Sequence, residues 1–106
     1  MADENTDKIL EIIELASKTG KIKKGSNEVT KTLERGTAKL VVAAQDTTPK
    51  EVIMHLPLLS KEKGIPYKEV PKKDELGAAA GLQVGTSAVS VVEEGEAKKL
   101  IAGLSK

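Results

Sequence analysis

Apolar residues recur along the chain with two spacings, which predict helices alternating with strands. Residues 6–19 repeat apolar side chains every three or four positions, the period of one helix face; these are Ile9, Ile12, Ile13 and Ala16. In residues 21–24, Ile22 lies between lysines, as expected for a short strand with two different faces. Residues 40–43 are continuously apolar, which favours a strand at 39–44 that is buried on both sides.

Turn and capping residues mark the remaining elements. Gly25-Ser26-Asn27 opens a second helix and Gly36 closes it. Thr48-Pro49-Lys50-Glu51 is a capping box that predicts a helix ending at Gly64, and Pro57 inside that helix predicts a kink. We expect further strands at 65–70 and 88–92 and further helices at 74–80 and 95–104. The alternation predicts a single α/β domain over residues 1–106, with helices on both faces of a parallel or mixed sheet.

Composition removes several classes of function. The chain has no cysteine, and Tyr67 is its only aromatic residue, so zinc knuckles, thiol catalysis and aromatic base-stacking platforms are excluded. His55, the only histidine, lies among apolar neighbours without an evident catalytic partner, and no carboxylates show calcium-loop spacing. The acidic N-terminus differs from a signal peptide, and no apolar run is long enough to span a membrane. We therefore expect a cytoplasmic protein that has no catalytic residue, metal or cofactor and does not associate with membranes.

The charge is unevenly distributed, although the net charge is only +1. Residues 1–14 carry five acidic side chains and one lysine, whereas residues 21–39 carry five lysines and one arginine against two glutamates. A basic stripe of this kind is the electrostatic pattern of a surface that binds a polyanion such as RNA.

The helix opened by Gly25 carries the most informative side chains. Free amide N–H groups at a helix start attract anions, and Asn27, Lys31 and Arg35 follow on one face at intervals of four. Phosphates repel a carboxylate at Glu28 unless that carboxylate accepts hydrogen bonds from a guanine edge. The alternative is an ordinary helix start, in which Ser26 or Asn27 is the cap and Glu28 forms a surface pair with Lys31.

A second candidate is the glycine-bounded loop at 81–86. Its aliphatic residues, Leu82 and Val84, can cover an unstacked nucleotide. In the alternative interpretation, one of these side chains packs into the core and the loop only joins a helix to a strand.

Several motifs in order resemble the L-thirty-e family of ribosomal proteins, and in particular its archaeal L-seven-Ae members. They are Lys23-Lys24-Gly25-Ser26-Asn27-Glu28-x-x-Lys31, Glu34-Arg35-Gly36, Ala38-Lys39-Leu40-Val41-Val42, His55-Leu56-Pro57-Leu58-Leu59 and Leu76-Gly77-x-x-x-Gly81. The resemblance covers about residues 6–104 and implies a three-layer α-β-α sandwich with a mixed four-stranded sheet.

The resemblance also implies a function. It implies binding to kink-turns in large-subunit rRNA, in box C/D and H/ACA guide RNAs and in ribonuclease P RNA, with roles in ribosome biogenesis and tRNA processing. The protein would be a monomer when free and the primary binder on which other ribonucleoprotein components assemble.

The resemblance assigns RNA-binding roles to particular residues. Asn27 and Glu28 would contact the guanines of tandem sheared G·A pairs. The RNA backbone would be contacted by Lys24, Gly25, Ser26, Lys31, Arg35 and Lys73. The loop that covers a flipped-out nucleotide would consist of Leu82, Gln83, Val84, Gly85 and Thr86.

Three residues depart from the family pattern. Gln45 and Gln83 replace acidic residues, which affects the expected RNA preference, and Lys72 replaces a serine cap at a cost of about 1 kcal/mol. Two other functions remain open from the sequence. One is an accessory RNA-recognition domain of a methyltransferase, although the chain is too short to include the catalytic half. The other is a small-anion or nucleotide-binding module at the Gly25 helix start, which leaves Glu28 without a role.

Overall fold

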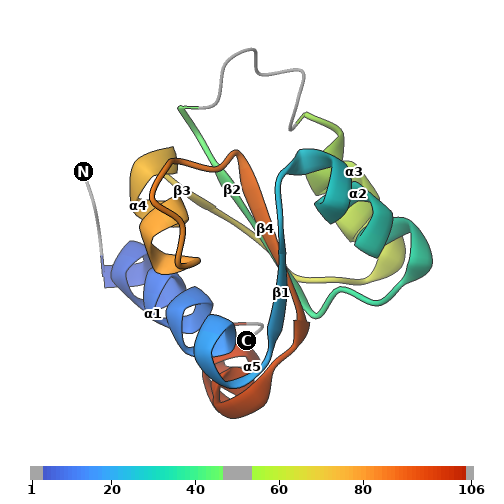
Figure 1. The fold of residues 1–106 in the computed structure, drawn as a ribbon. Coiled ribbons are helices and arrows are strands. Elements are labelled where there is room, and N and C mark those ends of the chain that lie inside the picture. Colours follow the sequence, from blue (N-terminus) through green and yellow to red (C-terminus); the bar gives the residue numbers. More distant parts are fainter. Residues whose placement is uncertain (1–3, 47–53, 105–106) are drawn as a thin grey trace.

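The computed structural model describes residues 4–46 and 54–104, which form three layers with a sheet between two groups of helices (Figure 1). The elements in chain order are α1 (Glu4–Thr19), β1 (Lys21–Lys24), α2 (Ser26–Arg35), β2 (Leu40–Ala44), α3 (His55–Lys63), β3 (Tyr67–Val70), α4 (Lys73–Ala79), β4 (Ala88–Glu93), the 3-10 helix η2 (Gly95–Ala97) and α5 (Lys98–Leu104). The predicted α/β class and the alternating order are confirmed.

The sheet is mixed, with the strand order β1-β4-β2-β3. β4 runs antiparallel to both β1 and β2, whereas β2 and β3 are parallel. All five residues of β2 are buried, which confirms the prediction of a strand covered on both faces. β1 is an edge strand with three exposed lysines, and charged side chains of this kind hinder unwanted pairing with another strand.

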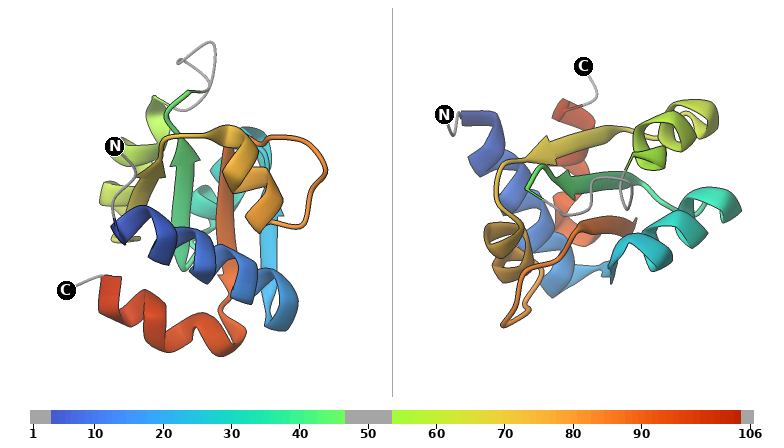
Figure 2. Two further views of the ribbon diagram at one scale, coloured as in Figure 1. Left: turned by 90° about the vertical axis from the view of Figure 1, so that its left-hand side faces the viewer. Right: turned by 90° about the horizontal axis from the view of Figure 1, so that it is seen from above.

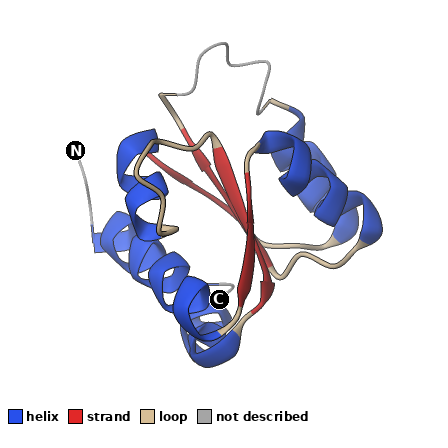
Figure 3. Cartoon of the chain, viewed as in Figure 1, coloured by secondary structure: helices blue, strands red, loops and turns tan. Residues whose placement is uncertain are grey.

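The alternation of side chains along β2 divides the core into two clusters. Leu40, Val42 and Ala44 pack on one face of the sheet, together with buried residues of α1, α4, η2 and α5. Val41 and Ala43 pack on the opposite face, together with Val29, Leu33 and Leu56 from α2 and α3. Figures 1–3 show the same division, with α1, α4 and α5 on one side and α2 and α3 on the other.

Two predicted helices differ in detail from the structure. The capping box Thr48-Pro49-Lys50-Glu51 lies outside the described residues, and α3 begins at His55. Pro57 is therefore in the first turn of α3, where its missing N–H removes no hydrogen bond within the helix, so the physical reason for predicting a kink there does not apply. The predicted helix over 95–104 consists of η2 followed by α5.

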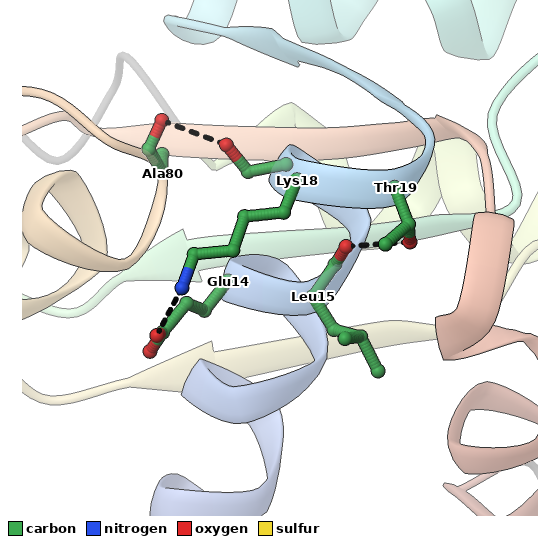
Figure 4. A network of polar contacts seen from close by, with 6 residues as sticks. Glu14, Leu15, Lys18, Thr19 and Ala80 are labelled. Carbon is green, nitrogen blue, oxygen red and sulfur yellow. Dashed lines mark hydrogen bonds and ion pairs between the residues drawn. The ribbon is translucent and has the colours of Figure 1, made fainter.

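The C-terminal end of α1 is fastened to neighbouring elements, as Figure 4 shows in part. The Ser17 hydroxyl lies 3.4 Å from the Ala80 carbonyl oxygen at the end of α4. Thr19 Oγ1 donates to the Leu15 carbonyl at 2.8 Å and accepts a hydrogen bond from the Glu96 N–H at 2.9 Å. These contacts hold α1 against both α4 and the start of the C-terminal helical segment.

Within residues 4–46 and 54–104, no helix is long and apolar enough to cross a lipid bilayer.

Candidate nucleic-acid interface

Three segments that the sequence singled out meet at one end of the sheet, the upper end in Figure 1. The strand register pairs Lys24 of β1 with Val89, and Ala43 of β2 with Ala88, so β1 and β2 end where β4 begins. β3 ends beside β2, because Val70 pairs with Ala44. This upper end of the sheet therefore carries the start of α2, the start of α4 and the last part of the α4–β4 loop (residues 81–87), where the Thr86 N–H donates to the Lys73 carbonyl oxygen.

Gly25 directly precedes α2, and it leaves the first amide groups of the helix uncovered. This residue has a φ of 92° and a ψ of 146°, a backbone conformation that favours glycine, and its N–H donates to the Ala88 carbonyl oxygen at 2.8 Å. Gly25 is the N-cap, and among the residues that the structure describes no side chain caps the helix, so the interpretation of Ser26 or Asn27 as an ordinary cap is wrong. The first amides of α2 and the positive end of its dipole are available to an anion.

The side chains of α2 divide sharply into buried and exposed faces. Val29 and Leu33 are fully buried against the sheet. Asn27, Lys31 and Arg35, which the four-residue spacing placed on one face, are all exposed. Packing of the apolar face therefore fixes the direction in which the candidate RNA-binding side chains point.

Glu28 forms the surface pair with Lys31 that the alternative interpretation predicted. A Glu28 oxygen lies 3.6 Å from Lys31 Nζ, and the two side chains retain 51% and 57% of their accessible surface. A pair this exposed contributes only about 0.2–0.5 kcal/mol, so it is easily exchanged for contacts with a ligand. The pair places the carboxylate beside the uncapped helix start and leaves it accessible.

The α4–β4 loop contains both anchored and free side chains. Leu82 is partly buried and packs against the core, as the alternative interpretation expected, and its N–H donates to the Gly77 carbonyl at 2.8 Å. Thr86 is buried, and its hydroxyl donates to the Ala88 carbonyl at 3.2 Å. Gln83 and Val84 are exposed, and Val84 retains 71% of its surface. The contacts favour these two residues as the part of the loop that reaches a ligand.

The start of α4 is capped by Asp46, a residue far away in the sequence. Lys72 is the N-cap and makes no side-chain capping bond, in agreement with its expected poor fit. The Lys73 N–H instead donates to Asp46 Oδ1 at 2.7 Å, across 27 residues of sequence. The only sequence signal for Asp46 was its position two residues after a buried strand. Lys73 itself is exposed at the upper end of the sheet, as required for the predicted contact with RNA.

The described residues provide no evident catalytic or metal centre. Residues 4–46 and 54–104 contain no group of three or more His, Asp or Glu side chains arranged to hold a metal ion. His55 is exposed, and its Nε2 lies 2.6 Å from Thr30 Oγ1, so it links α3 to α2.

Comparison with known proteins places this arrangement among characterised relatives. Residues 7–101 match the model of the ribosomal protein L7Ae/L30e/S12e/Gadd45 family. The structure is also similar to that of the Giardia lamblia 15.5kD RNA binding protein, with a TM-score of 0.90 and 32% sequence identity over 98% of this chain and 88% of that chain. Because the family model covers most of the sequence, the chain belongs to the ribosomal protein L7Ae/L30e/S12e/Gadd45 family.

Proposed function

We propose that the protein is an RNA-binding protein that recognises the kink-turn, a sharply bent RNA motif with tandem sheared G·A pairs. The observation that carries the proposal is the exposed Asn27-Glu28 pair at an uncapped helix start, beside the α4–β4 loop. The similarity to an RNA-binding protein from Giardia lamblia supports RNA as the ligand. Proteins of this kind are non-catalytic, and the chain is not an enzyme.

Glu28 supplies the argument for guanine recognition. A carboxylate is negatively charged and only accepts hydrogen bonds, so phosphates repel it. The N1–H and N2–H₂ groups of guanine, in contrast, can donate hydrogen bonds to it. In a sheared G·A pair the Watson–Crick edge of guanine is free to donate. Asn27, whose amide both donates and accepts, precedes Glu28 in the same exposed turn. Together the two side chains fit adjacent base edges better than they fit a phosphate chain.

The surrounding basic residues fit the RNA backbone. Lys24 ends β1, and Lys31 and Arg35 follow along the exposed face of α2. Gly25 and Ser26 bring main-chain groups close to the ligand without a bulky side chain. Lys73 approaches the same end from α4. These groups fix the position of the RNA, whereas Asn27 and Glu28 provide the sequence preference.

The α4–β4 loop completes the proposed site. The exposed Val84 and Gln83 would cover the flipped-out nucleotide, and Leu82, Gly85 and Thr86 would hold the loop backbone in place. Aliphatic contact takes the place of aromatic stacking in this chain. We propose kink-turns in large-subunit rRNA, box C/D and H/ACA guide RNAs and ribonuclease P RNA as the targets, with the protein as the first component to bind.

A gel-shift titration at fixed salt tests the proposal. It compares a kink-turn RNA with the same RNA in which Watson–Crick pairs replace the G·A pairs. We expect tight binding to the first and a loss of at least ten-fold with the second. Equal binding to both RNAs would refute kink-turn recognition. Adding inorganic phosphate at millimolar concentration tests the anion-module alternative, which predicts that free phosphate displaces the RNA at constant ionic strength.

A further inference from the structure

We propose that Asp46 is a positioning residue for RNA recognition: it fixes Lys73, and through Lys73 it fixes the α4–β4 loop. This inference rests on the proposed function and extends it to a residue that is not itself expected to touch RNA. The contacts form a path of three residues: Asp46 after β2, Lys73 at the start of α4, and Thr86 in the loop. Each step is a hydrogen bond, and Gly85 adds a tight packing contact.

The first step is the capping contact. Asp46 Oδ1 accepts the Lys73 N–H at 2.7 Å, and Lys73 is the first residue of α4. The preceding residue, Lys72, has extended backbone angles and no side chain that can cap. The start of α4 therefore depends on an acceptor supplied from the turn after β2. Without it, an amide at the helix start loses its protein partner.

The second step joins Lys73 to the loop. The Lys73 carbonyl oxygen accepts the Thr86 N–H at 3.2 Å. The N–H group of Lys73 therefore bonds to Asp46, and its carbonyl group bonds to the loop. Gly85 packs so closely that a Cβ at that position would lie 2.8 Å from Asp74 Oδ1 and 2.9 Å from Lys73 Cγ. A shift of the first turn of α4 is therefore transmitted to the loop.

Asp46, the first residue of this path, lies in the turn directly after β2 and is held close to the sheet. The Gln45 N–H donates to the Val70 carbonyl at 2.8 Å, which continues the pairing of β2 with β3 up to the residue before Asp46. The Gln45 side chain also donates to Glu69 Oε1 at 3.2 Å. Asp46 is thus held relative to the sheet, and the sheet also positions Gly25 and the start of α2.

The consequence is a fixed spacing between two parts of the proposed RNA site. The Gly25–Ala88 hydrogen bond ties the start of α2 to β4, and the Asp46–Lys73–Thr86 path ties the α4–β4 loop to β2. Because β2 and β4 are paired, the start of α2 and the α4–β4 loop are both attached to the same sheet, which keeps the distance between them constant. A pre-ordered site avoids the entropic cost of ordering a loop when RNA binds.

The first test uses the free protein and the variants Asp46→Ala and Asp46→Asn. Asparagine keeps a side-chain oxygen that can accept the Lys73 N–H but removes the charge, and Asp7→Ala removes an exposed charge from α1 as a control. We expect hydrogen exchange at Thr86 to accelerate about ten-fold in Asp46→Ala only, while exchange in α2 is unchanged. Unchanged exchange at Thr86 in Asp46→Ala would overturn the inference whatever the RNA results show.

The second test measures affinity for the kink-turn RNA. We expect Asp46→Ala to bind about ten-fold more weakly, Asp46→Asn and Asp7→Ala to bind within about two-fold of the parent, and Val84→Ala to be non-additive with Asp46→Ala. Additive losses, or equal losses in both Asp46 variants, would refute a role through the loop. If the parent does not distinguish the kink-turn from its Watson–Crick control, the proposed function fails, and hydrogen exchange alone then decides the structural role of Asp46.

Discussion

Substitution of Gly77 with alanine would test how closely α4 packs against the α4–β4 loop. Gly77 is buried within α4, and a Cβ there would lie 2.9 Å from Gly85 Cα and 3.0 Å from the Val84 carbonyl carbon. It would collide even more closely with the Val84 carbonyl oxygen. All three atoms belong to the main chain, so no flexible side chain can move aside to accommodate the methyl group.

Two opposing effects set the magnitude. Replacing glycine by alanine inside a helix raises the free energy of unfolding by about 1 kcal/mol, because a chain with alanine loses less conformational freedom on folding. Inserting a methyl group into a filled space costs about 1–3 kcal/mol, and the upper half of that range applies where main chain must move. We therefore expect Gly77→Ala to lower the free energy of unfolding by about 1–2 kcal/mol and the Tm by about 5–10 °C.

Urea unfolding followed by circular dichroism measures this change, and Gly103→Ala is the matched control. Gly103 lies in α5, where a Cβ would meet no atom within 4 Å, so alanine there should be neutral or stabilising by up to about 1 kcal/mol. If Gly77→Ala is as stable as the parent protein, the proposed close contact between α4 and the loop is not rigid, and the reasoning is refuted.

Three further predictions concern individual side chains. Glu28→Ala should weaken kink-turn binding by about 1–3 kcal/mol and hardly affect plain duplex binding in gel shifts, whereas the charge-matched Glu34→Ala should affect neither; equal losses on both RNAs would contradict guanine recognition. Lys31→Ala should reduce the slope of log affinity against log salt by about 0.7–0.9, and an unchanged slope would exclude a phosphate contact. Burial, followed by the hydrogen bond to Glu69, raises the pKa of Tyr67 well above its usual range. As the pH rises above ~10, the unfolded chain ionises Tyr67 before the folded protein does, so urea titrations should show the parent losing stability that Tyr67→Phe retains; parallel pH curves would refute this.

The local pattern of the sequence was sufficient for most of the fold. The period of apolar residues located α1, and the continuous apolar run located β2, because burial on one face or on two leaves different spacings in the sequence. Glycines marked the ends of α2 and α3. The kink was predicted at Pro57 because that residue was placed inside a helix, whereas it lies in the first turn of α3; the local sequence places a helix boundary only within a few residues.

The sequence by itself determined the start of the candidate site, because Gly25, Asn27, Glu28 and Lys31 are neighbours in the chain and a helix fixes their relative positions. Only the tertiary structure decided that Lys73 and the α4–β4 loop share the same end of the sheet, since strand order and register are set by pairing between distant segments. It also decided that Asp46, 27 residues away, replaces the missing cap on α4. Hydrogen bonds between distant residues leave no periodic trace in the sequence, because their geometry exists only after the sheet has formed.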